Sequence, residues 1–157
     1  PVFNKDRVPV VCEGDELYDV PVEIEGRVFN MSSLSWGNPH TVMFIDDVDT
    51  LDIAKYGPAI ENHPMFPKRT NVTFAQVIDR KNIKIREWER GTGETIGCGT
   101  GCCTAAVFGN RLGLTDREVS VEQIGGTLEI AWDSEDKVHM TGWSKIVYEG
   151  FYEYEAD

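Results

Sequence analysis

Apolar and polar residues alternate along much of the chain, which is the pattern of short strands with one buried face. We expect strands over residues 20–24, 27–36, 41–45, 72–78, 83–88, 119–123, 127–132, 137–141 and 146–154. Turn-forming pairs such as Glu25-Gly26 and Gly125-Gly126 separate several of these segments. The pattern therefore predicts a succession of mostly antiparallel strands.

Two stretches have helical spacing instead. Residues 50–62 place apolar side chains on one face, and we expect Gly57-Pro58 to break this stretch into two turns. A longer helix follows Cys98 and ends near Gly113. Between Cys102 and Phe108 its residues are apolar or small on nearly every side, which is typical of a helix buried on most faces.

These elements together predict an α+β fold, in which a mostly antiparallel or mixed sheet wraps around one central buried helix. A chain of 157 residues is long enough for one domain with a sizeable core, so we interpret residues 1–157 as a single domain. The start of the long helix, with Cys98, then lies at one open end of the wrapped sheet.

The charge balance limits the classes of partner. The chain has 27 acidic and 15 basic residues, a net charge of −12. Nucleic-acid binders need basic surfaces because phosphate contacts dominate their affinity, so neither nucleic acid nor an anionic membrane is an expected partner. No apolar run approaches the roughly 20 residues that span a bilayer.

The four cysteines are Cys12, Cys98, Cys102 and Cys103. Three of them are crowded together, which matches neither a disulfide framework nor the paired spacing of a zinc site. We therefore expect reduced cysteines in the cytoplasm and no bound metal. Cys102 and Cys103 are interpreted as small core residues, because free cysteine is often buried.

Cys98 is the exception, because glycines surround it in the run Gly97-Cys98-Gly99-Thr100-Gly101. The N-terminus of a helix presents unpaired N–H donors and a partial positive charge. Such a terminus binds carboxylates and lowers the pKa of a nearby thiol. The run predicts an activated thiolate beside an anion cradle, as in an enzyme that acts at the carbon next to a carboxylate.

Three motifs resemble diaminopimelate epimerases. Residues 88–101 resemble the second active-site signature of that family, and the segments 37–40 and 57–74 resemble further family motifs in the same order. The resemblance runs from about Pro9 to the C-terminus. It covers only the second half of such an enzyme, since the Cys-Gly-Asn-Gly signature of the first half does not occur. Gly142-Trp143 also departs from the Gly-Pro usual in the family.

The resemblance implies the C-terminal catalytic domain of a two-domain enzyme whose N-terminal domain is missing here. The family converts LL- to meso-diaminopimelate, a step toward lysine and peptidoglycan, without pyridoxal phosphate, metal or other cofactor. Two thiols act on opposite faces of the reacting carbon, and Cys98 is the one expected from this chain. The resemblance also implies that Glu89 assists the thiol and contacts the substrate amine, and that His40 assists proton transfer.

Substrate binding is expected from further residues of the same motifs. By resemblance, Arg90 binds the distal carboxylate, and Asn38 and Asn71 hydrogen-bond the distal end of the substrate. The backbone of Gly99, Thr100 and Gly101 is placed to bind the carboxylate beside the reacting carbon. From the residues alone, an asparagine beside a proline or at the start of a strand is more often a turn or cap residue, so both interpretations stay open.

Two alternatives remain at this stage. One is a related racemase that is independent of pyridoxal phosphate, and the other is a truncated binding module without activity. With one thiol of two, the chain by itself is expected to be inactive. The aromatic residues of the last predicted strand, which include Phe151 and Tyr152, are expected to reach toward the missing domain or to favour a homodimer.

Overall fold

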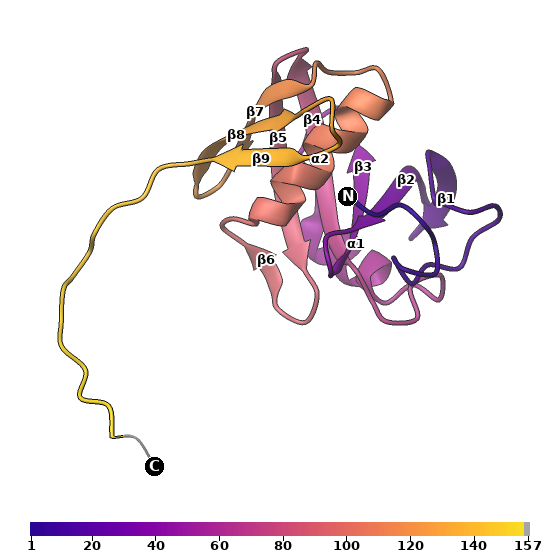
Figure 1. Cartoon of the computed structure of the whole chain (residues 1–157). Coiled ribbons are helices and arrows are strands. Elements are labelled where there is room, and N and C mark those ends of the chain that lie inside the picture. Colours follow the sequence, from indigo (N-terminus) through magenta and orange to yellow (C-terminus); the bar gives the residue numbers. More distant parts are fainter. Residues whose placement is uncertain (156–157) are drawn as a thin grey trace.

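The computed structural model describes residues 1–155, which form an α+β fold of two helices and a nine-stranded sheet (Figure 1). The strands are β1 (Val20–Ile24), β2 (Arg27–Ser35), β3 (Pro39–Phe44), β4 (Asn71–Asp79), β5 (Asn82–Glu89), β6 (Gly93–Thr95), β7 (Glu118–Gln123), β8 (Gly126–Trp132) and β9 (Val138–Thr141). The helices are α1 (Ile53–Glu61) and α2 (Gly99–Arg111). The predicted α+β class with a mixed sheet and eight of the nine predicted strands are confirmed.

The sheet is mixed, and its order is β1-β2-β3-β4-β5-β7-β8-β9, with β6 paired to β5 off this path. Strand β3 is parallel to β4, and β5 is parallel to β7, whereas the other neighbours are antiparallel. Parallel neighbours need a long crossover connection, and each helix lies in one of these crossovers. The parallel pairs therefore account for both helices.

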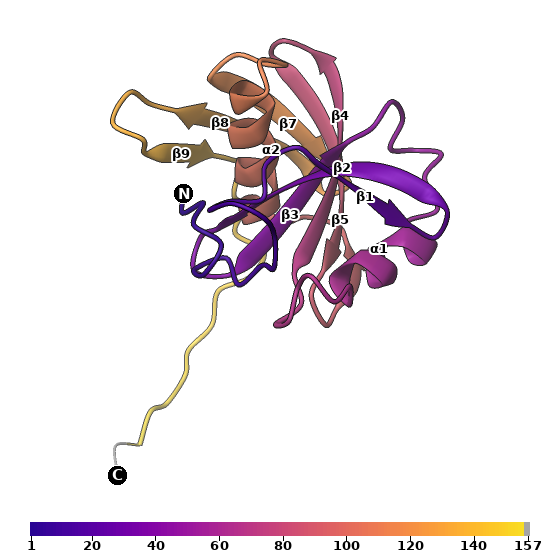
Figure 2. The ribbon, with the colours of Figure 1, turned by 90° about the vertical axis from the view of Figure 1, so that its right-hand side faces the viewer.

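The two helices cover opposite faces of the sheet, as the turned view shows (Figure 2). Strand β5 contacts both helices, because successive side chains of a strand point to opposite faces of the sheet. A Cβ added to Gly101 of α2 would lie 2.6 Å from the carboxyl of Glu87, and a Cβ added to Gly57 of α1 would lie 2.5 Å from the ring of Trp88. Glycine at both positions lets each helix approach β5 closely.

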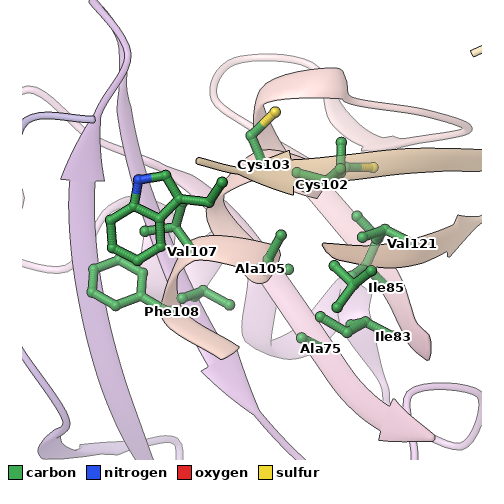
Figure 3. Packing of buried hydrophobic residues seen from close by; sticks show 14 of the residues in the cluster. Ala75, Ile83, Ile85, Cys102, Cys103, Ala105, Val107, Phe108 and Val121 are labelled. Carbon is green, nitrogen blue, oxygen red and sulfur yellow. The ribbon is translucent and has the colours of Figure 1, made fainter. Parts of the chain in front are cut away.

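Helix α2 is the centre of one of two apolar cores (Figure 3). Every residue from Gly101 to Gly109 is buried, as the run of small and apolar residues predicted. The helix contacts β3, β4, β5, β7, β8 and β9. Cys102 and Cys103 belong to this core, which agrees with their interpretation as packing residues.

The second core lies around α1, and the helix itself differs from the prediction. Residues 53–61 form one continuous helix that contains Pro58, so the expected break at Gly57-Pro58 is wrong. Packing explains the difference, because the close contact of Gly57 with Trp88 holds the helix against β5 and outweighs the local preference of proline.

The predicted last strand is also wrong. Residues 142–155 contain no helix or strand, and in Figure 1 this yellow segment runs away from the body of the molecule. A strand needs a neighbour for its hydrogen-bonding ladder, and β9 pairs only with β8 within the part of the chain that the structure describes. The alternating pattern at 146–154 therefore has nothing in this chain to pair with.

Candidate active site

The candidate active site lies where β3, β4 and β5 meet the start of α2. His40 on β3 is opposite Asn71 on β4, and Thr73 on β4 is opposite Glu87 on β5. The Nδ1 atom of His40 lies 3.7 Å from Oε1 of Glu87. Because Glu87 faces Gly101 of α2, these polar side chains lie on the face of the sheet that α2 covers.

Cys98 immediately precedes α2 and occupies its N-cap position, as predicted. Its N–H donates a hydrogen bond of 2.8 Å to Oε1 of Gln123, and its carbonyl accepts one of 3.0 Å from the N–H of Cys102. Its Sγ lies 3.5 Å from the hydroxyl of Thr100. These contacts fix the thiol at the mouth of the helix.

The thiol is far less acidic than the sequence suggested. Burial, and then the negative charge of Glu87, raise the pKa of Cys98 to about 11. The Thr100 hydroxyl and the Gly101 N–H oppose this shift but contribute less. The expected lowering of the pKa by the helix terminus is therefore wrong for this chain, because removal of the sulfur from water outweighs the donors around it.

His40 is completely buried and is held by two amides. Its Nε2 lies 3.1 Å from Nδ2 of Asn38 and 3.4 Å from Nδ2 of Asn71. Burial lowers the pKa of His40 to about 4, a shift that the charge of Glu89 opposes and that of Arg90 favours. The ring is therefore neutral at pH 7.

Asn71 connects several of the predicted residues. Its Nδ2 donates to the carbonyl of Pro39 at 3.0 Å, and its Oδ1 accepts the N–H of Arg90 at 2.9 Å. Both ends of the Asn71 amide are thus used within the chain, which favours the structural interpretation that the sequence left open. Asn38 is half-buried and contacts His40 through its amide nitrogen.

Glu89 and Arg90 lie at the rim of the site. Oε1 of Glu89 accepts a 2.7 Å hydrogen bond from the hydroxyl of Thr95, and its charge acts on both His40 and Cys98. The guanidinium of Arg90 donates to the carbonyl of Lys68 at 3.0 Å. Both side chains are half-buried, so they are held by the chain yet accessible from outside.

The glycine-rich turn begins the helix as expected. The first N–H groups of an α-helix have no partner within the helix, and the Gly101 N–H interacts with the sulfur of Cys98. Gly99 and Thr100 are half-buried, whereas Ile96 and Gly97 just before Cys98 are exposed. The turn therefore opens to solvent on the side from which the chain enters α2.

Three residues of the site were not anticipated, namely Thr73, Glu87 and Gln123. Glu87 continues the alternation of Ile83 and Ile85 on β5, and both isoleucines are buried against α2. This alternation was a usable signal, because it puts a carboxylate on a face that is otherwise apolar. Nothing in the sequence indicated Gln123, which reaches Cys98 from a strand that follows the helix.

A buried thiol, a neutral imidazole and two carboxylates around a helix terminus define a candidate site for proton transfer. Among residues 1–155, no cluster of three or more histidine, cysteine or acidic side chains is arranged to hold a metal ion. Over the same residues, no helix is long and apolar enough to cross a membrane.

Comparison with known proteins identifies the family. The family model described as diaminopimelate epimerase matches residues 32–147, and the chain belongs to this family. A diaminopimelate epimerase of Desulfitobacterium hafniense is 41% identical over 150 residues, and one of Cupriavidus taiwanensis is 47% identical over 150 residues. The first match covers 96% of this chain and 53% of the relative, and the second covers 94% and 51%.

The chain thus spans about half the length of the curated relatives it matches. Among solved structures, a phenazine biosynthesis protein of the PhzF family from Bacillus anthracis is 16% identical, with a TM-score of 0.47. That match covers 71% of this chain and 38% of the other. A likeness this distant does not bear on function.

Proposed function

We propose that this chain supplies one half of a diaminopimelate epimerase site, with Cys98 as one of its two acid–base thiols. The observation that carries the proposal is the position of Cys98 at the N-terminus of α2, close enough to Glu89 for that charge to act on it, in a chain of this family. The substrate would be diaminopimelate, interconverted between its LL and meso forms on the way to lysine and peptidoglycan.

The proposed reaction moves protons only. A thiolate on one face of the reacting carbon takes its proton, and the electron pair of the C–H bond stays on that carbon. A thiol on the opposite face then gives its proton to the same carbon. Cys98, as a thiol at pH 7, suits the donor role, whereas the thiol that the chain lacks would accept the first proton. No pyridoxal phosphate or metal takes part in this scheme.

The remaining residues are assigned to binding and to proton handling. Backbone N–H groups at Gly99, Thr100 and Gly101 would bind the carboxylate next to the reacting carbon, where each donor is worth about 3 kcal/mol in comparable oxyanion sites. Glu89 would meet the substrate amine, and Arg90 the distal carboxylate. These roles are taken from the family motifs and from the positions of the side chains at the rim.

Asn38, Asn71 and His40 complete the proposal. Asn38 uses only its amide nitrogen on His40 within the described residues, so its oxygen could serve the distal end of the substrate. Asn71 would act indirectly, because its amide joins His40 to the backbone of Arg90. His40 is neutral and buried, and it would set the geometry of the proton-transfer groups around it.

The proposal extends to the whole protein. A second domain of similar size would carry the opposite thiol and close the site over Cys98, so this chain by itself would be inactive. The sheet would then wrap α2 as a half-barrel, with the start of the helix facing the partner domain. The reduced state of all four cysteines suits the cytoplasm. Self-association as a homodimer belongs to the same proposal.

The experiment that tests this function is an epimerase assay on three samples: the chain alone, the chain with a supplied N-terminal half, and that pair with Cys98→Ala. We expect turnover only in the second sample, since the chain alone has one thiol of two and Cys98→Ala removes one of the two thiols from the pair. The loss should be at least about 10³-fold, as for other catalytic groups that act as a unit. Circular dichroism should show that the variant remains folded.

Cys12→Ala provides the matched control, because Cys12 is half-buried and belongs to the other core, near α1. It should retain turnover in the reconstituted pair. Undiminished epimerisation by Cys98→Ala would refute the proposed role of Cys98. Inactivity of the reconstituted wild-type pair toward diaminopimelate, with activity on another amino acid, would favour the racemase alternative, and binding without any turnover would favour the binding module.

A further inference from the structure

Four buried polar atoms at the site have no hydrogen-bond partner among residues 1–155: Nδ1 of His40, Oγ1 of Thr73, and both carboxyl oxygens of Glu87. They come from neighbouring positions on β3, β4 and β5, so they form one cluster rather than scattered defects. Buried polar groups normally have partners, because an unpaired one costs about 1–3 kcal/mol. A cluster of this kind is therefore a functional feature.

The amide of Asn71 fixes the proton on the His40 ring. Oδ1 of Asn71 accepts the backbone N–H of Arg90, so its Nδ2 is the end that faces Nε2 of His40 at 3.4 Å. An amide nitrogen only donates, so Nε2 of His40 accepts and Nδ1 carries the hydrogen of the neutral ring. Nδ1 lies 3.7 Å from Oε1 of Glu87, close enough for an electrostatic interaction but too far for a direct hydrogen bond.

The other side of the Glu87 carboxyl faces the start of α2. Gly101 leaves room for it, since a Cβ there would lie 2.6 Å from both oxygens. Cys98 is at the same helix terminus. The nearby Cys98 thiol and Thr73 hydroxyl, although neither has the geometry of a hydrogen bond to the carboxyl, partly offset the rise in the pKa of Glu87 that burial causes. The carboxyl of Glu87 thus lies between the imidazole of His40 and the thiol of Cys98.

Two acidic groups in the same buried site cannot both be ionised, because a negative charge on one raises the free energy of ionising the other. A carboxyl is intrinsically the stronger acid of the two, so any negative charge at the helix terminus belongs first to Glu87. The nearby groups that could change this balance are Glu89 on β5 and Cys102 on α2. Glu89 adds a further negative charge, and Cys102 is uncharged with its pKa raised.

We propose that Glu87 is a positioning residue that links His40 to Cys98 and, by competing with Cys98 for one negative charge, keeps Cys98 as the proton-donating thiol. The catalytic meaning of this inference rests on the proposed function, but the ionisation of Cys98 does not. In the resting site Cys98 is then the acid, and the thiol supplied by the other half is the base; the two thiols exchange these roles when the reaction runs in reverse.

The test measures the thiolate of Cys98 without any turnover. Iodoacetamide, which reacts with thiolates, is applied to the chain from pH 7 to pH 10, and mass spectrometry follows Cys98 separately from Cys102. In Glu87→Gln the carboxyl can no longer take the charge, so the pKa of Cys98 should fall by about one unit or more. Alkylation at pH 8 should then be at least about tenfold faster than in the wild type.

Glu23→Gln is the matched control, because it makes the same change on the exposed face of β1, far from the site. Its alkylation profile should coincide with that of the wild type. A Cys98 profile in Glu87→Gln that stays within a factor of about two of the wild type would overturn the proposal, since a neighbouring charge shifts a pKa by more than this. Cys102 is buried in the core around α2, so its alkylation would show that this core has opened.

If the variant unfolds or Cys102 becomes reactive, the unsubstituted chain decides the question. Carbon-13 labelling of the Glu side chains lets NMR follow the carboxyl carbon of Glu87 with pH. We expect the pKa of Glu87 to lie well above the ordinary glutamate value of 4.5, and its signal to respond again as Cys98 ionises. Titration of Glu87 near 4.5 would overturn the proposal, and it would leave the assay of the epimerase reaction unaffected.

Discussion

At the scale of single residues, burial rather than the helix terminus sets the ionisation of this site. The same loss of water raises the pKa of Cys98 to about 11 and lowers the pKa of His40 to about 4. In both cases the uncharged form is favoured, because a low-dielectric environment disfavours charge of either sign. The resting site therefore holds a thiol and a neutral imidazole, and in the proposed reaction the base would come from the other half.

His40 should make the stability of the chain depend on pH. Its pKa is 6.5 in the unfolded state and about 4 in the folded state, so between these values the unfolded chain binds more protons. The contribution of His40 to the free energy of unfolding is fully present above pH 6.5. This contribution falls by up to about 3 kcal/mol as the pH falls toward 4. Urea unfolding of wild type and His40→Gln should show this difference.

The free energy of unfolding must be compared between wild type and His40→Gln at each pH, because Glu87 changes the stability with pH in the opposite direction. The folded-state pKa of Glu87 is raised, so its contribution is lost as the pH rises above 4.5. The difference in unfolding free energy between wild type and His40→Gln should grow more favourable to the wild type from pH 4 to pH 6.5. A difference that stays flat over this range would contradict the assigned pKa of His40.

At the scale of elements, β5 determines what each helix touches. Its alternating side chains put Glu87 on the α2 side and Trp88 on the α1 side, and a glycine of each helix lies against them. Trp88 also donates through Nε1 to Oε2 of Glu61 at the end of α1, at 2.8 Å. The strand therefore couples the packing of both helices to the geometry of the site.

Gly101→Ala should destabilise the fold, because the new methyl group would lie closer to the buried carboxyl of Glu87 than real Cβ contacts allow, so that Glu87 must shift. The clash distance of 2.6 Å applies to Cδ and to both oxygens of Glu87. Overpacking of this kind costs about 1–3 kcal/mol, which exceeds the gain of at most about 1 kcal/mol from helix propensity. Urea unfolding measures the difference.

Gly150→Ala is the control for this substitution, because nothing lies within 4 Å of a Cβ at that position. It should change the unfolding free energy by less than about 0.5 kcal/mol. If Gly101→Ala were as neutral as Gly150→Ala, then Glu87 would not be pressed against the first turn of α2, and the link between Glu87 and Cys98 would lose its geometric basis.

At the scale of the whole molecule, the most conspicuous feature is an aromatic segment that packs against nothing in the described chain. Beyond β9, several large apolar side chains are more than three-quarters exposed: Trp143, Ile146, Val147, Tyr148, Phe151, Tyr152 and Tyr154. Exposed apolar area on this scale marks a surface meant for another protein segment. In the proposed two-domain enzyme, the natural occupant is the missing half.

Ending the chain after Gly142 should leave its thermal stability almost unchanged, because the removed residues are exposed and outside both cores. The melting temperature should shift by no more than about 1 °C, since surface changes stay within roughly 0.5 kcal/mol. The shortened chain should also self-associate less in analytical ultracentrifugation. A large loss of thermal stability would show that the segment packs on this domain.

Local patterns in the sequence were enough for most elements and for the centre of the site. The alternation of apolar and polar residues predicted eight strands correctly, because each of them has one face against a core. The run of small and apolar residues after Cys98 predicted α2, because a helix that is buried on all sides needs such residues. The motifs also indicated Cys98, His40 and Glu89, which lie together in the structure. Residues 146–154 alternate in the same way, yet they lack a neighbouring strand and stay unpaired.

Tertiary structure decided what these residues do to one another. Glu87 and Gln123 are distant from Cys98 in sequence, and only the pairing of β5 with β4 and of β7 with β5 brings them to the start of α2. The ionisation of Cys98 and His40 depends on how much water and charge remain around each atom, which no local pattern records. The sequence alone determined the glycine-rich turn with Cys98 and the motif residues around it, whereas packing determined which further groups join them and which of them hold protons.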